Sequence, residues 1–383
     1  MTPRGRIVVA GRFADVSGQA GATWAVMQYV LGLCELGYDV WALEPIADAA
    51  AASRRSLRPI RAWFERTVAE FGLAGKAALL LGGDRDRAGV GATRRTIRRV
   101  CADADLLLNI SGVLRDPALL ELFSTRVYLD VDPAFNQFWH AGGVDRGFSA
   151  HTHHFTVGVT VGEPDCTVPT FGLRWRPTVP PVVLERWPVA PLAPAGAYTT
   201  IGNWRSYGSI HAGGVFYGQK AHSLRLLSEL PLRSPEQFRL ALAIHPDEKA
   251  DLRMLGAQGW HLADPARVAS STAAYRGFIA TSKAEIGIAK AGYVRSRCGW
   301  FSDRSACYLA SGRPVVCHDT GFGSRLPSGQ GLLCFGSLDG AVEAIEAVAC
   351  DYTSHARAAR EIAESHLDSR RVLEQMIDEV QPQ

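Results

Sequence analysis

Short aliphatic runs alternate with helical stretches along this chain, and that alternation constrains its fold more than any other feature. The first unit runs from Arg6 through Gly11, continues into a stretch over residues 24–36 with apolar positions at helical spacing, and returns to an apolar run over 38–44. Gly37 stands where a left-handed residue commonly ends a helix. Because strands joined by helices in this order form parallel sheets, the sequence predicts an α/β protein.

The same alternation continues to the end of the chain. Further strands are predicted over residues 104–111, 125–131, 198–202, 238–244, 277–280, 314–317 and 332–335, and the tail over about 338–380 is predicted to be helical. A chain of 383 residues is long enough for two domains, each with its own hydrophobic core.

Proline usage marks the expected boundary between the domains. Eight of the twenty prolines fall between Pro164 and Pro194, and proline is excluded from helix interiors and central strands. We therefore predict an N-terminal domain over residues 1–190 and a C-terminal domain over residues 191–383, with the last helix able to pack back on the first domain.

The net charge, the basic stretches and the targeting signals of the sequence limit which partners and which cellular compartment are expected. The formal charge is 41 − 38 = +3, which gives no general argument for nucleic acid, so no nucleic-acid partner is expected. Arginine-rich stretches over 54–66 and 94–99 are typical of solvated helix faces, and we expect membrane contact to be at most peripheral. No secretory leader and no run of about 18 apolar residues is present, which predicts a cytoplasmic protein.

Neither a metal nor a redox centre is indicated by the sequence. The eight cysteines are scattered without a Cys-x-x-Cys pair, which is typical of free thiols in a reducing compartment. The sequence His151-Thr-His-His154 looks metal-like by itself, but without a partner cluster it is more typical of a polar surface turn.

Three segments carry a family resemblance. The stretch Gly299–Gly321, with the sequence GWFSDRSACYLASGRPVVCHDTG, resembles the donor-site segment of GT-B glycosyltransferases, where a helix ending in Ala-Ser-Gly-x-Pro-Val-Val runs into a strand and a Thr/Gly loop. The Gly18–Gly21 loop with its following helix is similar to their opening segment. Thr200–Arg205 followed by Tyr217–Leu224 is similar to the first strand and helix of the donor domain in family-4-like enzymes.

The resemblance implies two Rossmann-like domains facing across a cleft, with the acceptor on the N-terminal side and the donor on the C-terminal side. It implies transfer of a hexosyl or pentosyl group from a nucleoside diphosphate sugar to a small-molecule or glycan acceptor, with no cofactor and no metal. The Ala-, Arg- and Gly-rich composition suggests natural-product biosynthesis by analogy.

The chain also departs from the family. The two glutamates of the retaining pattern Glu-x7-Glu fall on Gly299 and Cys307, which makes the resemblance closer to a divergent, spore-maturation-like group-1 branch. An epimerase or phosphorylase on the same fold, or a non-catalytic nucleotide-sugar-binding protein, remains an alternative.

Donor-binding residues follow from the resemblance and from the chemistry of a diphosphate, which suits basic side chains and helix N-termini. Arg205 and Lys220 are expected to hold the diphosphate jointly, because the glycine-containing loop between them can fold back. The other candidates are Gly18, Gly21, Ser302, Asp303, Arg304, Ser305, Thr320 and Gly321. The glycines also fit plain turns, and Ser302 or Asp303 also fits a helix cap.

The catalytic base is the least determined of the site residues. Asp130 and Asp132 follow a predicted strand of the N-terminal half, where a carboxylate can reach a cleft, and Asp15 in the first loop is a further candidate. Asp132 precedes a proline and fits a turn equally well. Aromatic residues fit an acceptor platform or a core between the domains; they are Phe135, Phe138, Trp139, Trp175 and Trp187.

Overall fold

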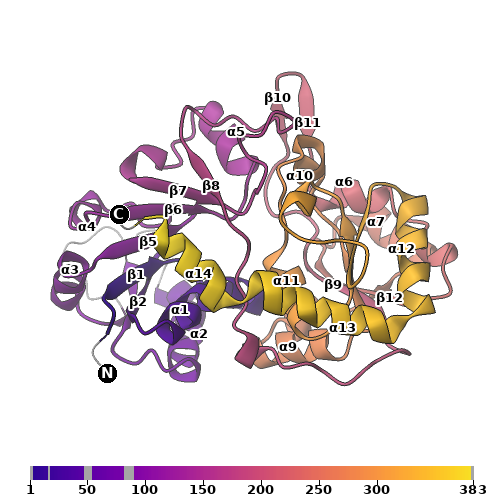
Figure 1. Cartoon of the computed structure of the whole chain (residues 1–383), viewed down its shortest axis with the longest axis horizontal. Coiled ribbons are helices and arrows are strands. Elements are labelled where there is room, and N and C mark those ends of the chain that lie inside the picture. Colours follow the sequence, from indigo (N-terminus) through magenta and orange to yellow (C-terminus); the bar gives the residue numbers. More distant parts are fainter. Residues whose placement is uncertain (1–2, 16–17, 47–53, 82–89, 381–383) are drawn as a thin grey trace.

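The computed structural model describes residues 3–15, 18–46, 54–81 and 90–380. Figure 1 shows two α/β halves side by side, each with a sheet covered by helices. Nearly all strand pairs of both sheets are parallel, so the α/β prediction is confirmed.

The N-terminal half is built on an eight-stranded sheet in the order β4-β3-β2-β1-β5-β6-β7-β8. Only β3 and β4 pair in an antiparallel manner among its described strands. The strands are β1 (Arg6–Ala10), β2 (Asp39–Ile46), β3 (Ala77–Leu81), β4 (Val90–Gly91), β5 (Leu106–Ile110), β6 (Arg126–Asp130), β7 (His153–Thr156) and β8 (Trp175–Pro177). The helices are α1 (Ala20–Glu35), α2 (Arg54–Glu70), α3 (Arg94–Ala102), α4 (Pro117–Leu120) and α5 (Phe135–Ala141), with short turns η1 (Phe148–Ala150) and η2 (Leu184–Arg186).

The C-terminal half is built on a six-stranded parallel sheet in the order β13-β12-β9-β14-β15-β16, with a separate hairpin β10-β11. The strands are β9 (Tyr198–Asn203), β10 (Ile210–Ala212), β11 (Val215–Tyr217), β12 (Phe238–Ala243), β13 (His261–Leu262), β14 (Ala284–Gly287), β15 (Val315–His318) and β16 (Leu332–Phe335). The helices are α6 (Lys220–Arg225), α7 (Lys249–Ala257), α8 (Pro265–Val268), α9 (Thr272–Ala280), α10 (Ala291–Ser296), α11 (Asp303–Ala310), α12 (Leu338–Cys350), α13 (Tyr352–Ile362) and α14 (Ser369–Asp378), with short turns η3 (Leu230–Leu232), η4 (Phe322–Ser324) and η5 (Ala363–Leu367).

One predicted strand is wrong. Residues 277–280 form the last turn of α9, which begins after Ser271, whose side chain accepts a hydrogen bond from the backbone N–H of Ala274. The neighbouring strand is β14, a few residues later. A short apolar run fits the end of a buried helix as well as a strand, and the capping serine decides in favour of the helix.

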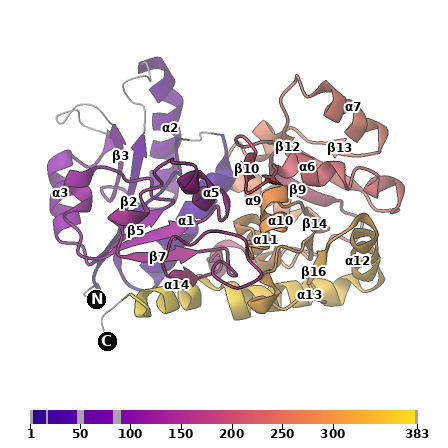
Figure 2. The same ribbon diagram turned by 90° about the horizontal axis from the view of Figure 1, so that it is seen from above.

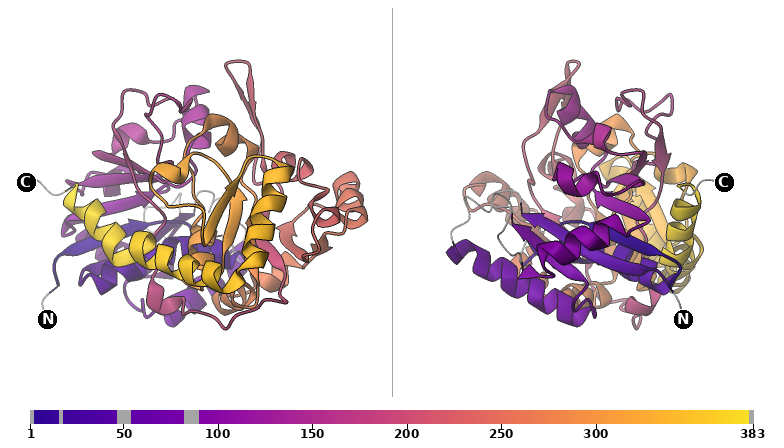
Figure 3. Two further views of the ribbon diagram at one scale, coloured as in Figure 1. Left: turned by 45° about the vertical axis from the view of Figure 1, so that its right-hand side comes forward. Right: turned by 90° about the vertical axis from the view of Figure 1, so that its left-hand side faces the viewer.

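The C-terminal helix α14 returns to the first half and packs on α1. A Cβ atom on Gly32 of α1 would lie 2.6 Å from Leu373 and 2.7 Å from Ser369 of α14, so the two backbones approach closely at this glycine. Arg370 at the start of α14 forms an ion pair with Glu35 at the end of α1. Figure 2 and Figure 3 show the yellow helices α13 and α14 running along both halves.

A shared core joins the halves. Trp24 of α1 packs on Trp187 of the linker at 5.0 Å between ring centroids, and its indole N–H donates to the backbone carbonyl of Thr272 in α9. Helix α1 is buried on nearly all its sides, as expected of a helix that lies between two packed layers. Helix α1 of the N-terminal half therefore packs directly against the linker and α9.

Candidate active site

Two adjoining cavities lie between the halves, near the carboxyl ends of β1, β6, β9 and β14. The larger has a volume of about 590 Å³ and the smaller about 500 Å³. Residues from both halves line each cavity, and four residues line both: Gly202, Asn203, Asp303 and Arg304. The cavities therefore form one trough with a junction at these four residues, where open α/β sheets commonly bind ligands.

Two cationic side chains converge on the junction. A Cβ atom on Gly202 would lie 3.6 Å from Nζ of Lys220 and 3.8 Å from Nη1 of Arg304. Arg304 forms a 2.6 Å ion pair with buried Glu285 and donates to the carbonyl of Ile201. Lys220 is only 8% exposed, and no described carboxylate forms an ion pair with it. Burial, with Arg304 nearby, lowers the pKa of Lys220 well below its usual value.

The start of α11 contributes to the same junction. The Ser302 hydroxyl accepts a hydrogen bond from the backbone N–H of Arg304 at 3.2 Å, so Ser302 caps the helix while lining the larger cavity. Asp303 lines both cavities. Burial raises the pKa of its carboxyl, and the Arg304 guanidinium acts against that shift.

Gly18 and Gly21 line the smaller cavity, at the start of α1. A Cβ atom on Gly21 would lie 3.2 Å from the ring of Tyr275, which forms another part of the wall. A larger side chain at residue 21 would therefore press on this ring. The smaller cavity is therefore lined mainly by small and apolar residues, with the ring of Tyr275 as the aromatic group of its lining.

Asp132 is the carboxylate that the N-terminal half contributes to the larger cavity. Its oxygens accept hydrogen bonds from the hydroxyls of Tyr207 and Tyr293, and from Nζ of Lys290 at 3.0 Å. The Lys290 ammonium also lies 4.2–5.0 Å from the ring centroids of Tyr207, Phe135 and Tyr293. Burial lowers the pKa of Lys290, and the nearby Asp132 carboxylate acts against that shift. Burial and the same carboxylate both raise the pKa values of Tyr207 and Tyr293.

The other two acidic candidates line neither cavity. Asp130 is fully buried and accepts hydrogen bonds from Asn136 at 2.6 Å, Gln137 at 2.8 Å and Thr156 at 3.0 Å. Burial raises the pKa of its carboxyl. Asp15 pairs with Arg12 at 2.6 Å. The structure therefore brings Asp132 to the cleft and leaves Asp130 and Asp15 outside it.

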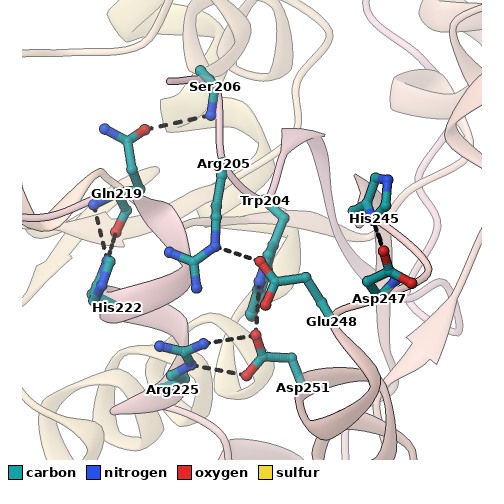
Figure 4. A network of polar contacts seen from close by, with 10 residues as sticks. All are labelled: Trp204, Arg205, Ser206, Gln219, His222, Arg225, His245, Asp247, Glu248 and Asp251. Atoms are coloured by element: carbon teal, nitrogen blue, oxygen red, sulfur yellow. Dashed lines mark hydrogen bonds and ion pairs between the residues drawn. The ribbon is translucent and has the colours of Figure 1, made fainter. Parts of the chain in front are cut away.

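Arg205 and Lys220 do not meet at one point. The Arg205 guanidinium pairs with Glu248 at 2.5 Å, next to the Arg225–Asp251 pair (Figure 4). Arg205 lines neither cavity. The loop between Arg205 and Lys220 folds back as the β10-β11 hairpin, and the backbone N–H of Ala221 donates to the carbonyl of Trp204 at 3.2 Å where its two ends meet. The two side chains still part, because Arg205 pairs with Glu248 whereas Lys220 lies beside Gly202. Gly213 and Gly214 make the turn of that hairpin with φ angles of 57° and 76°.

Ser305, Thr320 and Gly321 also lie outside both cavities. The Thr320 hydroxyl donates to the carbonyl of Trp300 at 2.6 Å, and the Thr320 carbonyl accepts from the N–H of Gly299 at 2.7 Å. Trp300 lines the larger cavity. Thr320 therefore contributes by holding the segment that precedes α11.

Sequence reasoning missed Tyr207, Lys290, Tyr293 and Arg146, all of which line the larger cavity. Lys290 and Tyr293 follow the carboxyl end of β14, the position that favours ligand-binding residues. Because the sequence predicts this strand at 277–280, Lys290 and Tyr293 do not stand directly after a predicted strand and were not singled out. Of the predicted aromatic platform, Trp139 lines the cavity, whereas the side chains of Phe135, Phe138, Trp175 and Trp187 are buried.

The interpretation of His151–His154 as a surface turn is wrong for two of its histidines. His151 and His154 are buried, and their ring nitrogens contact the backbone carbonyls of Gly147 and Phe148. In the part of the chain that the structure describes, no three His, Cys, Asp or Glu side chains gather as a metal ion would require.

Comparisons with known proteins place this geometry in a fold family. No protein-family model matches the sequence, and no curated protein matches it. Among solved structures, an alpha-glucosyltransferase in complex with UDP and a 13-mer DNA is 11% identical, with a TM-score of 0.62 over 98% of this chain and 99% of its own. HepE from Anabaena, in complex with UDP and glucose, is 11% identical, with a TM-score of 0.58 over 98% of this chain and 99% of its own.

A third similar structure is AviGT4, a glycosyltransferase involved in avilamycin A biosynthesis. It is 13% identical, with a TM-score of 0.54 over 98% of this chain and 97% of its own. The chain has the GT-B fold. The GT-B resemblance of the sequence, with two Rossmann-like halves facing across a cleft, is thereby confirmed at the level of the fold.

One expectation is corrected by the same comparison. A formal charge of only +3 favours the expectation that no nucleic acid is bound. The alpha-glucosyltransferase is seen with DNA bound and has the same GT-B fold over nearly its whole length, so the fold does not exclude nucleic acid. Net charge fails here because it says nothing of where the cations lie. Among the described residues, no helix is both long and apolar enough to cross a bilayer.

Proposed function

We propose that this GT-B chain is a glycosyltransferase whose donor is a nucleoside diphosphate sugar. The observation that carries the proposal is the pair Lys220 and Arg304, which converge on Gly202 at the junction of the two cavities. A buried ammonium without a carboxylate partner is costly. A diphosphate bound at the junction would supply the missing negative charge, and solved structures of the same fold contain UDP, which supports this ligand class.

The trough has room for the rest of the donor. We place the nucleoside in the smaller cavity beside the Tyr275 ring, where Gly18 and Gly21 leave space. The Asp303 carboxylate at the junction suits the ribose hydroxyls. The sugar then extends into the larger cavity, on the side of Asp132.

The reaction breaks the bond between the anomeric carbon and a diphosphate oxygen, and it forms a bond between that carbon and an acceptor oxygen. Negative charge develops on the departing diphosphate, where Lys220 and Arg304 stabilise it. These two cations supply positive charge that a bound metal ion would otherwise supply. Asp132 is our candidate for accepting the proton of the acceptor hydroxyl, because its three donors leave one of about four lone-pair directions open.

We propose a hexose or pentose as the transferred group, and a glycan or small-molecule hydroxyl as the acceptor. The similarity to AviGT4 supports a role in natural-product biosynthesis. The epimerase, phosphorylase and non-catalytic alternatives are not favoured, because the similar solved structures are of transferases.

The proposal is tested by titrating UDP and uridine into the protein in a calorimeter. Lys220→Ala should weaken UDP binding roughly tenfold to a hundredfold, because a charge-assisted hydrogen bond contributes about 1.5–3 kcal/mol. Uridine affinity should change little. Arg205→Ala is the matched control, since this guanidinium pairs with Glu248 outside both cavities.

UDP affinity in the Arg205→Ala variant should therefore stay close to that of the wild type. A wild-type protein that binds no UDP, or a Lys220→Ala variant that binds UDP normally, would contradict the proposed donor site.

A further inference from the structure

Arg146 of the N-terminal half lines the larger cavity. It is half-buried and lies over the Trp139 ring, with 5.3 Å between the guanidinium carbon and the ring centroid. Nε and Nη2 donate to Oδ1 of Asn136 at 3.1 and 2.8 Å. No carboxylate among the described residues forms an ion pair with Arg146. Among the described residues, the hydrogen-bond acceptor and the ring that this guanidinium contacts are thus neutral groups, the Asn136 amide and the Trp139 side chain.

This guanidinium is held in place by buried groups. Asn136 is 1% exposed, and its amide nitrogen donates to Oδ1 of Asp130 at 2.6 Å. Asp130 is itself fully buried and fixed by Gln137 and Thr156. The chain of hydrogen bonds from Arg146 through Asn136 to Asp130 therefore orients the guanidinium. Such pre-organisation reduces the entropy lost when a ligand binds.

The charges of the larger cavity are unbalanced after the ion pairs are counted. Lys290 pairs with Asp132, Arg12 with Asp15, and Arg304 with Glu285. The charged side chains of the lining that remain without an ion pair are Lys220, Arg146 and the carboxylate of Asp303, which lies at the junction beside Arg304. Lys220 is accounted for by the donor diphosphate in the proposed function, whereas Arg146 is not, because it belongs to the other half of the molecule.

We propose that the acceptor carries a phosphate group, and that Arg146 binds it while Trp139 packs against the adjoining ring or apolar face. This inference rests on the proposed function, since it assigns the acceptor of that same site. A guanidinium fork matches phosphate oxygens, and its contact with an aromatic face leaves the outer N–H groups available. The phosphate can belong to a phosphorylated sugar or to a nucleic-acid backbone, which share this chemistry.

The experiment uses the full chain saturated with UDP. Three probes are titrated separately: a hexose monophosphate, the same hexose without phosphate, and a short single-stranded oligothymidine. At least one phosphate probe should bind, more weakly as salt rises, and the unphosphorylated hexose should bind much more weakly. Arg146→Gln should reduce the affinity for the binding phosphate probe roughly tenfold to a hundredfold.

Arg115→Gln is the matched control. It removes the same charge from nearby on the surface, where Arg115 pairs with exposed Asp145 at 3.4 Å and lines neither cavity. This variant should bind the phosphate probe as the wild type does. Unchanged UDP affinity in Arg146→Gln shows that the variant is folded and that the donor site is intact.

The outcomes separate the two proposals. Binding of the hexose monophosphate alone, or of oligothymidine alone, supports the phosphate proposal and identifies its source. If neither phosphate probe binds, or if Arg146→Gln leaves their affinity unchanged while UDP still binds, the acceptor proposal is overturned and the donor proposal stands. A wild-type protein that binds no UDP overturns the proposed function instead.

Discussion

Glu44 at the end of β2 fixes the loop that follows β1. Its carboxylate is fully buried and accepts three backbone hydrogen bonds, from the N–H groups of Phe13 and Ala14 at 3.0 and 2.7 Å and of Asp15 at 2.8 Å. Burial raises the pKa of Glu44 to about 7, against the effect of the three N–H donors. Sequence reasoning had no signal for this role, because a glutamate in a strand usually faces solvent.

The raised pKa makes stability depend on pH in a defined direction. In the unfolded chain the Glu44 carboxyl loses its proton near its ordinary pKa of about 4.3, whereas in the folded protein it keeps the proton up to about pH 7. Over that interval the folded state binds more protons, so the free energy of unfolding falls as pH rises. The contribution is fully present below about pH 4 and is lost through about pH 7.

We predict that the wild type loses roughly 2–3 kcal/mol of stability relative to Glu44→Gln between about pH 5 and pH 8. Urea unfolding of both proteins at each pH measures the difference, and the subtraction removes the contribution of other titrating groups. A difference that stays constant, or that grows in favour of the wild type as pH rises, would show that burial does not dominate the pKa of Glu44.

At the scale of elements, the contact between α1 and α14 is tested by one glycine. Gly32→Ala would place a Cβ atom 2.6 Å from Leu373 and 2.7 Å from Ser369, so the helices must shift. Overpacking of this kind costs about 1–3 kcal/mol. We therefore predict that Gly32→Ala lowers the free energy of unfolding, measured with urea, by about 1–3 kcal/mol.

Gly256→Ala in α7 is the matched control for Gly32→Ala, since both glycines are helical and nothing lies within 4 Å of the Cβ position at Gly256. This variant should be unchanged or more stable by up to about 1 kcal/mol, because alanine favours helix. Equal effects of the two substitutions would mean that α14 does not pack tightly on α1.

The elements also show what sequence reasoning can reach. The βα alternation and the segment from Gly299 to Gly321 predict the fold, because periodicity and local turn chemistry are properties of short stretches. Lys220 and Arg304 are far apart in the chain and converge on Gly202. The family resemblance predicts that both residues lie near the donor. The partners of Asp132 were missed because the strand before Lys290 was placed too early.

The Arg205 expectation shows a different limit. Arg205 and Lys220 flank a glycine-containing loop, and glycine permits such a loop to fold back. The sequence does not show which way the side chains at the two ends of the loop turn. The structure forms the β10-β11 hairpin, and Glu248 from a distant segment captures the Arg205 side chain.

At the scale of the whole molecule, the two halves are joined by more than the linker. Helix α14 packs on α1, the Trp24–Trp187 contact lies between the halves, and Gly158 pairs with Trp300 across them. These contacts hold Asp132 of the first half against Lys290 of the second. Side chains of both halves therefore form the walls of the trough.

The central claim, that the donor diphosphate binds at Lys220 and Arg304, is tested most directly by a crystal structure of the protein with UDP bound. The account predicts diphosphate oxygens within hydrogen-bond distance of Lys220 Nζ and the Arg304 guanidinium, with the uracil in the smaller cavity beside Tyr275. A diphosphate bound beside Arg205 and Glu248, with the trough empty, would contradict it.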